Sequence, residues 1–421
     1  MEHDLIEKVT HLVFQLAVIL AAAKVGGEIC QRFLRVPPVL GELVVGIIIG
    51  PFALGQIDIP GLGPLFEAPH NGGTVPVSTE LYAVSQIAAI VLLFTAGLET
   101  DLKQFIRYAG PATAVAIGGV VFPFLFGVGA TLLFKPGGLE GAPLLYSALF
   151  VGAVMTATSV GITARVLNDI RRLDSAEGVT ILAAAVVDDV LGILVLTIIV
   201  GLSGPDHSAD IGSVALVGAK AIGFWLALLV GGILISKYIS AALTSFRGAG
   251  STIALALALA FLAAGLAESF GLAMIIGAYT IGLALSDTPL ARRVEEPMMS
   301  VYHALVPVFF VVMGMLVDIT AMSGVLLFGA VISILAIVSK VVGSGLPALF
   351  TGFNRIGSWR IGIGMLPRGE VALIIAGIGL SRGIIGVDVF GVSVLMTVVT
   401  TLMAPLILVP SFRRGGRGMR G

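Results

Sequence analysis

The feature that most constrains this chain is a series of apolar stretches, each about 20 residues long and separated by short charged or Gly/Pro-rich breaks. A helix of about 20 apolar residues is long enough to cross the hydrocarbon core of a bilayer. Hydrophobic residues make up 57% of the 421 residues and charged residues only 12%, which is about half the charged fraction of a soluble domain. The sequence therefore predicts an all-α integral membrane protein, organised as one membrane unit without a soluble domain.

The limits of the apolar stretches predict about thirteen transmembrane helices. No A-x-A cleavage site follows the first stretch, so we expect it to remain as a helix. The expected helices cover residues 5–23, 36–55, 81–98, 110–134, 143–168, 176–201, 212–236, 251–267, 271–286, 299–317, 322–349, 361–380 and 388–412.

Lys and Arg residues are unevenly divided among the breaks. Alternate breaks and the C-terminal tail hold 18 of the 24, whereas the opposite breaks hold three. Because loops rich in Lys and Arg stay on the cytoplasmic side, we expect the N-terminus outside and the C-terminus inside. The 18 residues are Lys24, Arg32, Arg35, Lys103, Arg107, Arg165, Arg171, Arg172, Lys237, Arg247, Arg292, Arg293, Arg355, Arg360, Arg413, Arg414, Arg417 and Arg420.

Two apolar stretches are interrupted in the middle. Residues 155–161 (Met-Thr-Ala-Thr-Ser-Val-Gly) contain three hydroxyl side chains and a glycine, and residues 366–370 (Leu-Pro-Arg-Gly-Glu) contain proline, glycine and two charges. Such interruptions predict broken helices, and a pair of them, one in each half of a chain, is typical of inverted-repeat transporters. In those proteins the half-helix ends and freed carbonyl groups hold an ion near the middle of the membrane.

The polar residues of the two breaks have several possible roles. Thr158 and Ser159 could lend oxygen atoms to an ion or could satisfy the freed backbone groups. Arg368 and Glu370 could neutralise each other, cap the opposing half-helix dipoles or contact the ion directly. We interpret all four as residues that support the broken helices.

Asp188 and Asp189 are adjacent carboxylates within an otherwise uncharged stretch. Neighbours on a helix point about 100° apart, so one can face a cavity while the other faces a neighbouring helix. Burial and mutual repulsion both favour the protonated form of a carboxylic acid. Such a group can hold either a proton or a cation, and hard cations prefer oxygen ligands. This competition is the chemical requirement for cation/proton exchange.

Lys340 is also placed inside an expected helix. A charge at this depth is costly, by roughly 3 kcal/mol on insertion scales, and calls for a partner. Its ammonium group is a natural partner for one of the two aspartates, through which proton occupancy could couple to cation binding. Alternatively, Lys340 could extend its side chain toward the inner surface.

Several segments together resemble the monovalent cation:proton antiporter superfamily, in the electrogenic bacterial branch that includes NapA and, more remotely, NhaA. The resemblance extends over nearly the whole chain. The matching segments are residues 40–42 (Leu-Gly-Glu), 49–51 (Ile-Gly-Pro), 93–99 (Leu-Phe-Thr-Ala-Gly-Leu-Glu), 157–160 (Ala-Thr-Ser-Val), 309–310 (Phe-Phe) with Gly314, the pair Asp188-Asp189, Lys340 and 367–370 (Pro-Arg-Gly-Glu).

This resemblance implies a fold of thirteen helices with two crossing broken helices, a homodimer, and a core domain that moves against a dimerisation domain in an elevator-like alternation. It implies Asp189 as the principal ion-binding carboxylate and pairing of Asp188 with Lys340. The expected division assigns residues 1–109 and 237–317 to the dimerisation domain, 110–201 and 322–412 to the core domain, 212–236 to a linking helix and 413–421 to a basic cytoplasmic tail.

The resemblance also bears on the transported ions. Electroneutral members typically carry Asn-Asp where this chain has Asp-Asp, which favours two protons per cation. Glutathione-gated potassium efflux proteins are similar, but they usually have Gln-Asp there and carry a nucleotide-binding domain, which we do not expect here. The sequence thus favours a Na+ or Li+/H+ antiporter for pH homeostasis in a bacterial cytoplasmic membrane, with K+/H+ exchange as the nearest alternative.

Other classes of function fit the sequence less well. An ion channel would need an uninterrupted conduction path, and a sodium-coupled solute symporter would need an additional polar substrate pocket. Phosphate-binding loops, metal-spaced Cys/His sets and nucleophilic triads are lacking. We therefore expect no enzymatic activity, no cofactor, no metal beyond the transported cation and no nucleic-acid partner, with membrane lipid as the surroundings.

Overall fold

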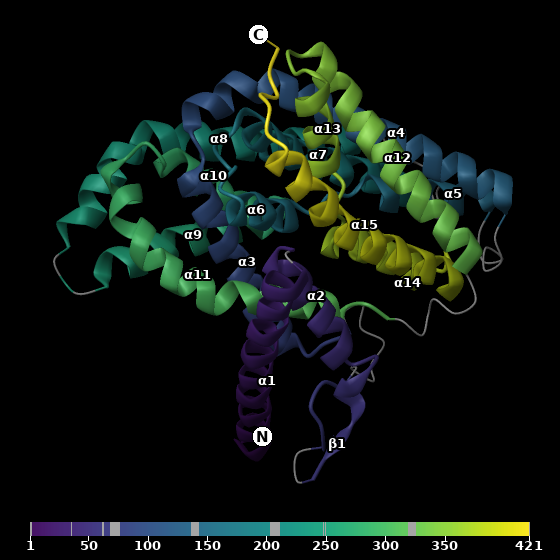
Figure 1. The fold of residues 1–421 in the computed structure, drawn as a ribbon, viewed down its shortest axis with the longest axis horizontal. Helices are drawn as coiled ribbons and strands as arrows, with labels where there is room; N and C mark the ends of the chain where they lie inside the picture. Colours follow the sequence, from purple (N-terminus) through teal and green to yellow (C-terminus); the bar gives the residue numbers. More distant parts are fainter. Residues whose placement is uncertain are drawn as a thin grey trace.

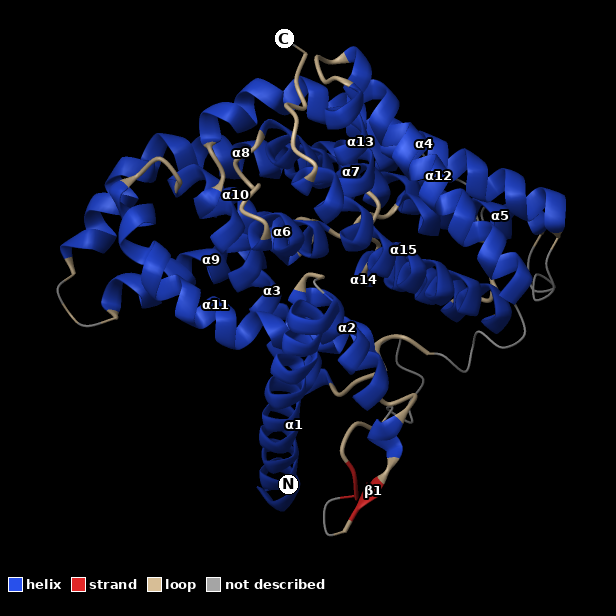
Figure 2. Ribbon diagram, in the orientation of Figure 1, coloured by secondary structure: helices blue, strands red, loops and turns tan. Residues whose placement is uncertain are grey.

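The computed structural model describes residues 2–34, 36–60, 63–67, 76–135, 143–202, 211–246, 248, 250–318 and 326–420. These residues are nearly all helical, as Figure 2 shows, and their only strands are β1 (Asp58–Ile59) and β2 (Gly63–Pro64), which form a short antiparallel ribbon. Within these described ranges, ten helical segments are long and apolar enough to cross a membrane, and three shorter apolar helices accompany them. The all-α membrane architecture is thus confirmed, whereas the number of about thirteen spans stays a prediction.

The helices follow the apolar stretches of the sequence. Their bounds are α1 (Glu2–Ile29), continued by the π-helical turn η1 (Cys30–Leu34), α2 (Pro38–Ile49), the short 3-10 helix η2 (Leu54–Gln56), α3 (Thr79–Glu99), α4 (Leu102–Phe134), α5 (Leu144–Thr156), α6 (Val160–Asp169), α7 (Ala176–Leu202), α8 (Ile211–Ser245), α9 (Ser251–Ser269), α10 (Met274–Leu285), α11 (Pro289–Met315), α12 (Leu326–Phe350), α13 (Arg355–Gly364), α14 (Glu370–Ser381) and α15 (Val387–Arg413).

Two groups of helices pack mainly within themselves (Figure 1). In the first body (α1–α3 and α8–α11), α3 packs against α10 and α11, α2 against α1 and α11, and α10 against α8 and α9. In the second body (α4–α7 and α12–α15), α4 packs against α5, α7 and α12, while α12 also packs against α13 and α15. The contact of α8 with α7 and the contacts of α6 with α2 and α3 connect the two bodies.

The helices that begin well before the positions expected from the sequence include α4 and α11, because charged residues extend them beyond their apolar part. We expected helices from residues 110 and 299, whereas α4 begins at Leu102 and α11 begins at Pro289. The Asp101 side chain caps α4 by accepting hydrogen bonds from the backbone of Lys103 and Gln104, as short acidic side chains do at helix starts. A domain boundary at residue 110 would therefore divide α4.

Glycines allow α4 and α12 to pack closely in the second body. A Cβ atom on Gly118 would lie 2.0 Å from the carbonyl oxygen of Gly343, so neither helix could carry a larger residue at this crossing. Small residues permit such close contacts between membrane helices. This contact brings Lys340, one turn before Gly343, against the backbone of α4.

The chain after α15 packs on the end of the second body that lies near α13 (Figure 1). Arg360 of α13 is 3% exposed. Its guanidinium donates hydrogen bonds to the Glu177 carboxylate and to the carbonyl oxygens of Ser411, Gly415 and Gly416. Arg360, which the sequence places in a cytoplasmic break, therefore ties the start of α7 to α13 and to residues 415–416.

Candidate functional site

The site begins with two broken helices that cross. The two interrupted stretches form the pairs α5/α6 and α13/α14, which confirms the predicted breaks. Where the extended segments meet, the backbone N–H of Ser159 donates a 2.8 Å hydrogen bond to the carbonyl oxygen of Pro367. The Thr163 hydroxyl donates to the carbonyl oxygen of Gly364 at 2.7 Å. Backbone groups freed by one break are thus satisfied partly by the other, as the absence of water in a bilayer requires.

Asp188 forms an ion pair beside this crossing. The Lys340 ammonium lies 2.9 Å from Asp188 Oδ1 and donates 2.7 Å hydrogen bonds to the carbonyl oxygens of Gly119 and Thr156. Lys340 is 0% exposed and Asp188 is 2% exposed. An ammonium group has three donors, and each has an acceptor here. Burial of a pair is tolerated when its members satisfy each other and the remaining donors are also bonded.

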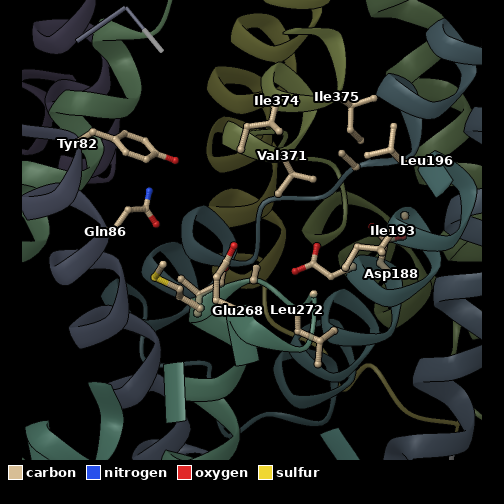
Figure 3. Close-up of a pocket in the computed structure, with 17 residues that line it drawn as sticks. Tyr82, Gln86, Asp188, Ile193, Leu196, Glu268, Leu272, Val371, Ile374 and Ile375 are labelled. Carbon is tan, nitrogen blue, oxygen red and sulfur yellow. The ribbon is translucent and has the colours of Figure 1, made fainter. Parts of the chain in front are cut away.

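Asp189 is the next residue of α7 and lines a cavity of about 340 Å³. Figure 3 shows the Tyr82 hydroxyl, the Gln86 amide and the Glu268 carboxylate turned toward the same space. Apolar residues of α7 and α14 complete the wall. Asp189 itself is only 7% exposed. Asp188 also lines the cavity (Figure 3), which therefore gives both buried aspartates access to small solutes.

The cavity approaches the site from a defined side of the helices. Its outer wall comes from the start of α3 and from the turn between α9 and α10. These ends are opposite to those where the chain carries most of its Lys and Arg residues. If the ends rich in Lys and Arg lie on the cytoplasmic side of the membrane, the cavity faces the outside.

Arg368 lies at the carboxyl ends of two half-helices. Its guanidinium donates hydrogen bonds to the carbonyl oxygens of Met155, in the last turn of α5, and of Leu366, just after α13. It is 0% exposed. A cation at the negative end of a helix dipole is stabilising. Of the roles that the sequence left open, the geometry corresponds to a dipole cap. Glu370 begins α14, and its side chain lies outside the described residues.

The hydroxyl residues of the first break differ in their contacts. The Thr158 hydroxyl donates a 3.3 Å hydrogen bond to the carbonyl oxygen of Met365, so it links the two breaks. The Ser159 hydroxyl oxygen is buried and has no hydrogen-bond partner among the described residues. Both side chains are nearly inaccessible, with Thr158 1% exposed and Ser159 3% exposed. Thr158 therefore contacts both the backbone of the second break and the Asp188 side chain, whereas Ser159 keeps an oxygen available at the crossing.

The sequence pattern placed buried cations such as Arg165 and Arg360 in cytoplasmic breaks and did not indicate part of the cavity wall. We assigned Arg165 to a cytoplasmic break, whereas it lies within α6, 5% exposed, and contacts Glu42 of α2. Its immediate neighbours are Ala164 and Val166, but the charged residues Asp169, Arg171 and Arg172 that follow made this part of the sequence resemble a loop. Tyr82, Gln86 and Glu268 reach the cavity only because α3 and α9 pack opposite α7. Their spacing in the sequence contains no signal of this.

The geometry describes a membrane carrier with carboxylates, an ammonium and a guanidinium gathered at two crossed broken helices. The chain belongs to the sodium/hydrogen exchanger, transmembrane family, whose model matches residues 17–414. It is 35% identical to the Na(+)/H(+)-K(+) antiporter GerN of Bacillus cereus, over 97% of this chain and 98% of that protein. It is also 35% identical to the high-affinity Na(+)/H(+) antiporter NhaS3 of Synechocystis, over 94% of this chain and 88% of that protein.

A solved structure shares the fold. The sodium proton antiporter MjNhaP1 from Methanocaldococcus jannaschii, at pH 8, matches with a TM-score of 0.67 over 95% of this chain and 96% of that chain. The sequence identity is 18%. The fold expected from the sequence is therefore confirmed, as is the multi-pass membrane character of the chain.

Proposed function

We propose that this chain is a secondary antiporter that exchanges H+ for Na+ or Li+, with Asp189 as the principal cation-binding carboxylate. The observation that carries the proposal is the position of Asp189, a buried carboxylate on the wall of a cavity of about 340 Å³. The adjacent Asp188 is already paired with Lys340. Both aspartates line the cavity, and Asp188 is in addition held by an ammonium group, so we assign the two residues different tasks.

Competition between proton and cation supplies the exchange. A buried carboxylate is costly to leave charged and alone, so it crosses the membrane carrying either H+ or a monovalent cation. Oxygen atoms close to the crossing, such as the Ser159 hydroxyl, suit a hard cation. Lys340 can pass a proton when its contact with Asp188 opens, which would couple both aspartates to one cycle and would make the exchange electrogenic.

Movement between the two bodies would provide alternating access. The ion site is built almost wholly from the second body, since Asp188, Asp189, Lys340 and Arg368 all come from it. The first body contributes one wall of the cavity. A rigid shift of the second body past the first would carry the site from one side to the other without dismantling it. We propose that the first body forms a homodimer in a bacterial cytoplasmic membrane, N-terminus outside.

The experiment measures the internal pH of proteoliposomes after addition of Na+, Li+ or K+, for the wild type, for Asp189→Asn and for the control Asp174→Asn. Asp174 is an exposed carboxylate just before α7. We expect proton movement driven by Na+ and Li+ in the wild type and the control, and its loss in Asp189→Asn. Full activity of Asp189→Asn would refute the assignment of the cation site.

Potassium is the alternative cation, because the name of the relative GerN includes K+. Proton movement driven by K+ alone would change the assignment to K+/H+ exchange at the same site. Because protons compete with the cation, the apparent KM for Na+ should rise as the pH falls, by up to about tenfold per pH unit for one competing proton. A KM that is constant from acid to alkaline pH would contradict competition at a carboxylate.

A further inference from the structure

A second charge cluster, in which Arg165 and Glu42 are buried, lies away from the ion site, where α6 meets the first body. Arg165 of α6 places its Nη2 atom 3.5 Å from Glu42 Oε1 of α2 and its Nε atom 3.1 Å from Asp169 Oδ1 of α6. Its guanidinium also lies 5.2 Å from the ring centroid of Tyr302 in α11. We call these four residues the Arg165 cluster.

The two carboxylates of the Arg165 cluster belong to different bodies. Asp169 lies on the same helix as Arg165, so their contact persists however α6 moves. Glu42 belongs to the first body, so its contact with Arg165 joins the bodies. A second link runs in parallel, since Asn168 Nδ2 of α6 donates a 3.0 Å hydrogen bond to Glu99 Oε2 of α3.

The Arg165 cluster and the large cavity lie at opposite ends of the boundary between the bodies. The cavity lies beyond the crossing, toward the start of α3. The cluster lies along α6 and contacts the start of α2, and Asn168 reaches the last residue of α3. Glu42 is 2% exposed and Arg165 is 5% exposed. One end of the boundary is therefore open, while the other is closed by buried charges.

We propose that the Arg165 cluster is the seal that closes this end, and that the Glu42–Arg165 contact sets how often the chain adopts the conformation with the cavity open. The proposal rests on alternating access between the two bodies. When the second body shifts, α6 moves away from α2, so that Glu42 and Arg165 separate. Arg165 retains its ion pair with Asp169, because both residues lie on α6. Glu42 thus stabilises one conformation selectively, which is the condition for shifting a population.

Charged groups suit a seal that must open in every cycle. Separating a buried ion pair returns both members to water, so the lost attraction is largely offset by hydration. The single 3.5 Å contact is also weaker than the ion site, since Glu42 Oε2 is buried and accepts no hydrogen bond among the described residues. A modest free-energy change, such as that of cation binding at the ion site, can then shift the equilibrium between the conformations with the cavity open and closed.

The test uses labelling of a cysteine in the cavity, in the chain with Cys30→Ser and Ile374→Cys. Ile374 lines the cavity and is 41% exposed. A membrane-impermeant maleimide, added from either side of proteoliposomes without an ion gradient, reports how often the cavity is open. We compare Glu42→Gln, which removes the charge contact between the bodies, with the matched control Asp169→Asn, which removes a carboxylate from the same guanidinium within one body.

We expect slower labelling in Glu42→Gln and no slowing in Asp169→Asn. If the open conformation is favoured about 10:1, a tenfold shift of the equilibrium makes it about 1:1 and slows labelling about twofold. Glu99→Gln, which weakens the second link, should slow labelling to a smaller extent and serves if Glu42→Gln does not fold. Equal slowing in Glu42→Gln and Asp169→Asn, or no slowing in Glu42→Gln and Glu99→Gln, would overturn the seal.

The labelling is independent of transport, so the two proposals can fail separately. If the seal is wrong, labelling is unchanged while Na+-driven proton movement persists in the wild type. If the antiporter assignment is wrong, proton movement is lacking in the wild type, whatever the labelling shows.

Discussion

Two buried ion pairs in this chain differ in what holds them. Lys340 and Asp188 lie within the second body at 2.9 Å, and the remaining two ammonium donors have carbonyl acceptors at 2.7 Å. Arg165 and Glu42 join the two bodies at 3.5 Å. The first pair is complete and moves as part of one body, whereas the second is a weaker contact between surfaces. The comparison shows that burial alone does not define the role of a charged residue. The role depends on whether its partner lies in the same body or in the other one.

The largest effect should come from breaking the complete pair. Lys340→Met leaves the Asp188 carboxylate buried without its cation, which costs about 3–5 kcal/mol. We expect a large fall in the thermal midpoint of the detergent-solubilised protein and loss of Na+-driven proton movement. The double variant Lys340→Met with Asp188→Asn should recover most of the stability, since no uncompensated charge remains. A single variant as stable as the wild type would show that the pair is not a fixed part of the second body.

The close packing beneath Lys340 gives the next largest effect. Gly118→Ala places a methyl group 2.0 Å from the Gly343 carbonyl oxygen, and such overpacking costs about 1–3 kcal/mol. Because α4 and α12 must separate, the hydrogen bond from Lys340 to Gly119 should weaken as well. Gly129→Ala is the matched control, since it lies in the same helix with open space around the new Cβ atom. Equal thermal midpoints for the two variants would contradict the packing argument.

The contact between the bodies should contribute less to stability. In Glu42→Gln the Arg165 guanidinium keeps Asp169, so no buried cation is left alone, and we expect a loss of about 1–2 kcal/mol. This loss should be clearly smaller than that of Lys340→Met when both are measured by thermal unfolding under the same conditions. A larger fall in the thermal midpoint for Glu42→Gln than for Lys340→Met would mean that the contact between the bodies stabilises the protein more than the pair within the second body.

The smallest effect belongs to a half-buried carboxylate outside both pairs. Hydrogen bonds from the backbone of Gln104 and Lys103 hold the pKa of Asp101 below its usual value. A lowered pKa means that the stabilising contribution is present at neutral pH and is lost as the pH falls below about 4. Asp101→Ala should cost about 1 kcal/mol as a lost helix cap, and this cost should vanish in acid. A pH-independent cost, measured from thermal midpoints, would exclude the carboxylate as its source.

Much of the fold could be predicted from local patterns. Apolar length places the spans, and the hydroxyl, proline and glycine residues at 155–161 and 366–370 place the breaks, because both signals act within a single helix. The same patterns placed the start of α4 and of α11 too late, since hydropathy does not register helical residues that extend beyond the membrane core. The candidate charges at 188, 189, 340 and 368 were also visible, because any charge within an apolar stretch is conspicuous.

The sequence by itself determined that the chain is helical, spans a membrane, and carries paired carboxylates and a lysine at depth. The family resemblance implied that Asp188 pairs with Lys340, but only the tertiary structure decided that the two aspartates line a cavity, that Arg368 caps two half-helices, and that Arg165 meets Glu42. The physical reason is that hydropathy and helix breaking depend on neighbours along the chain, whereas each of these contacts joins helices far apart in the sequence. Their partners are chosen by packing, which no local pattern records.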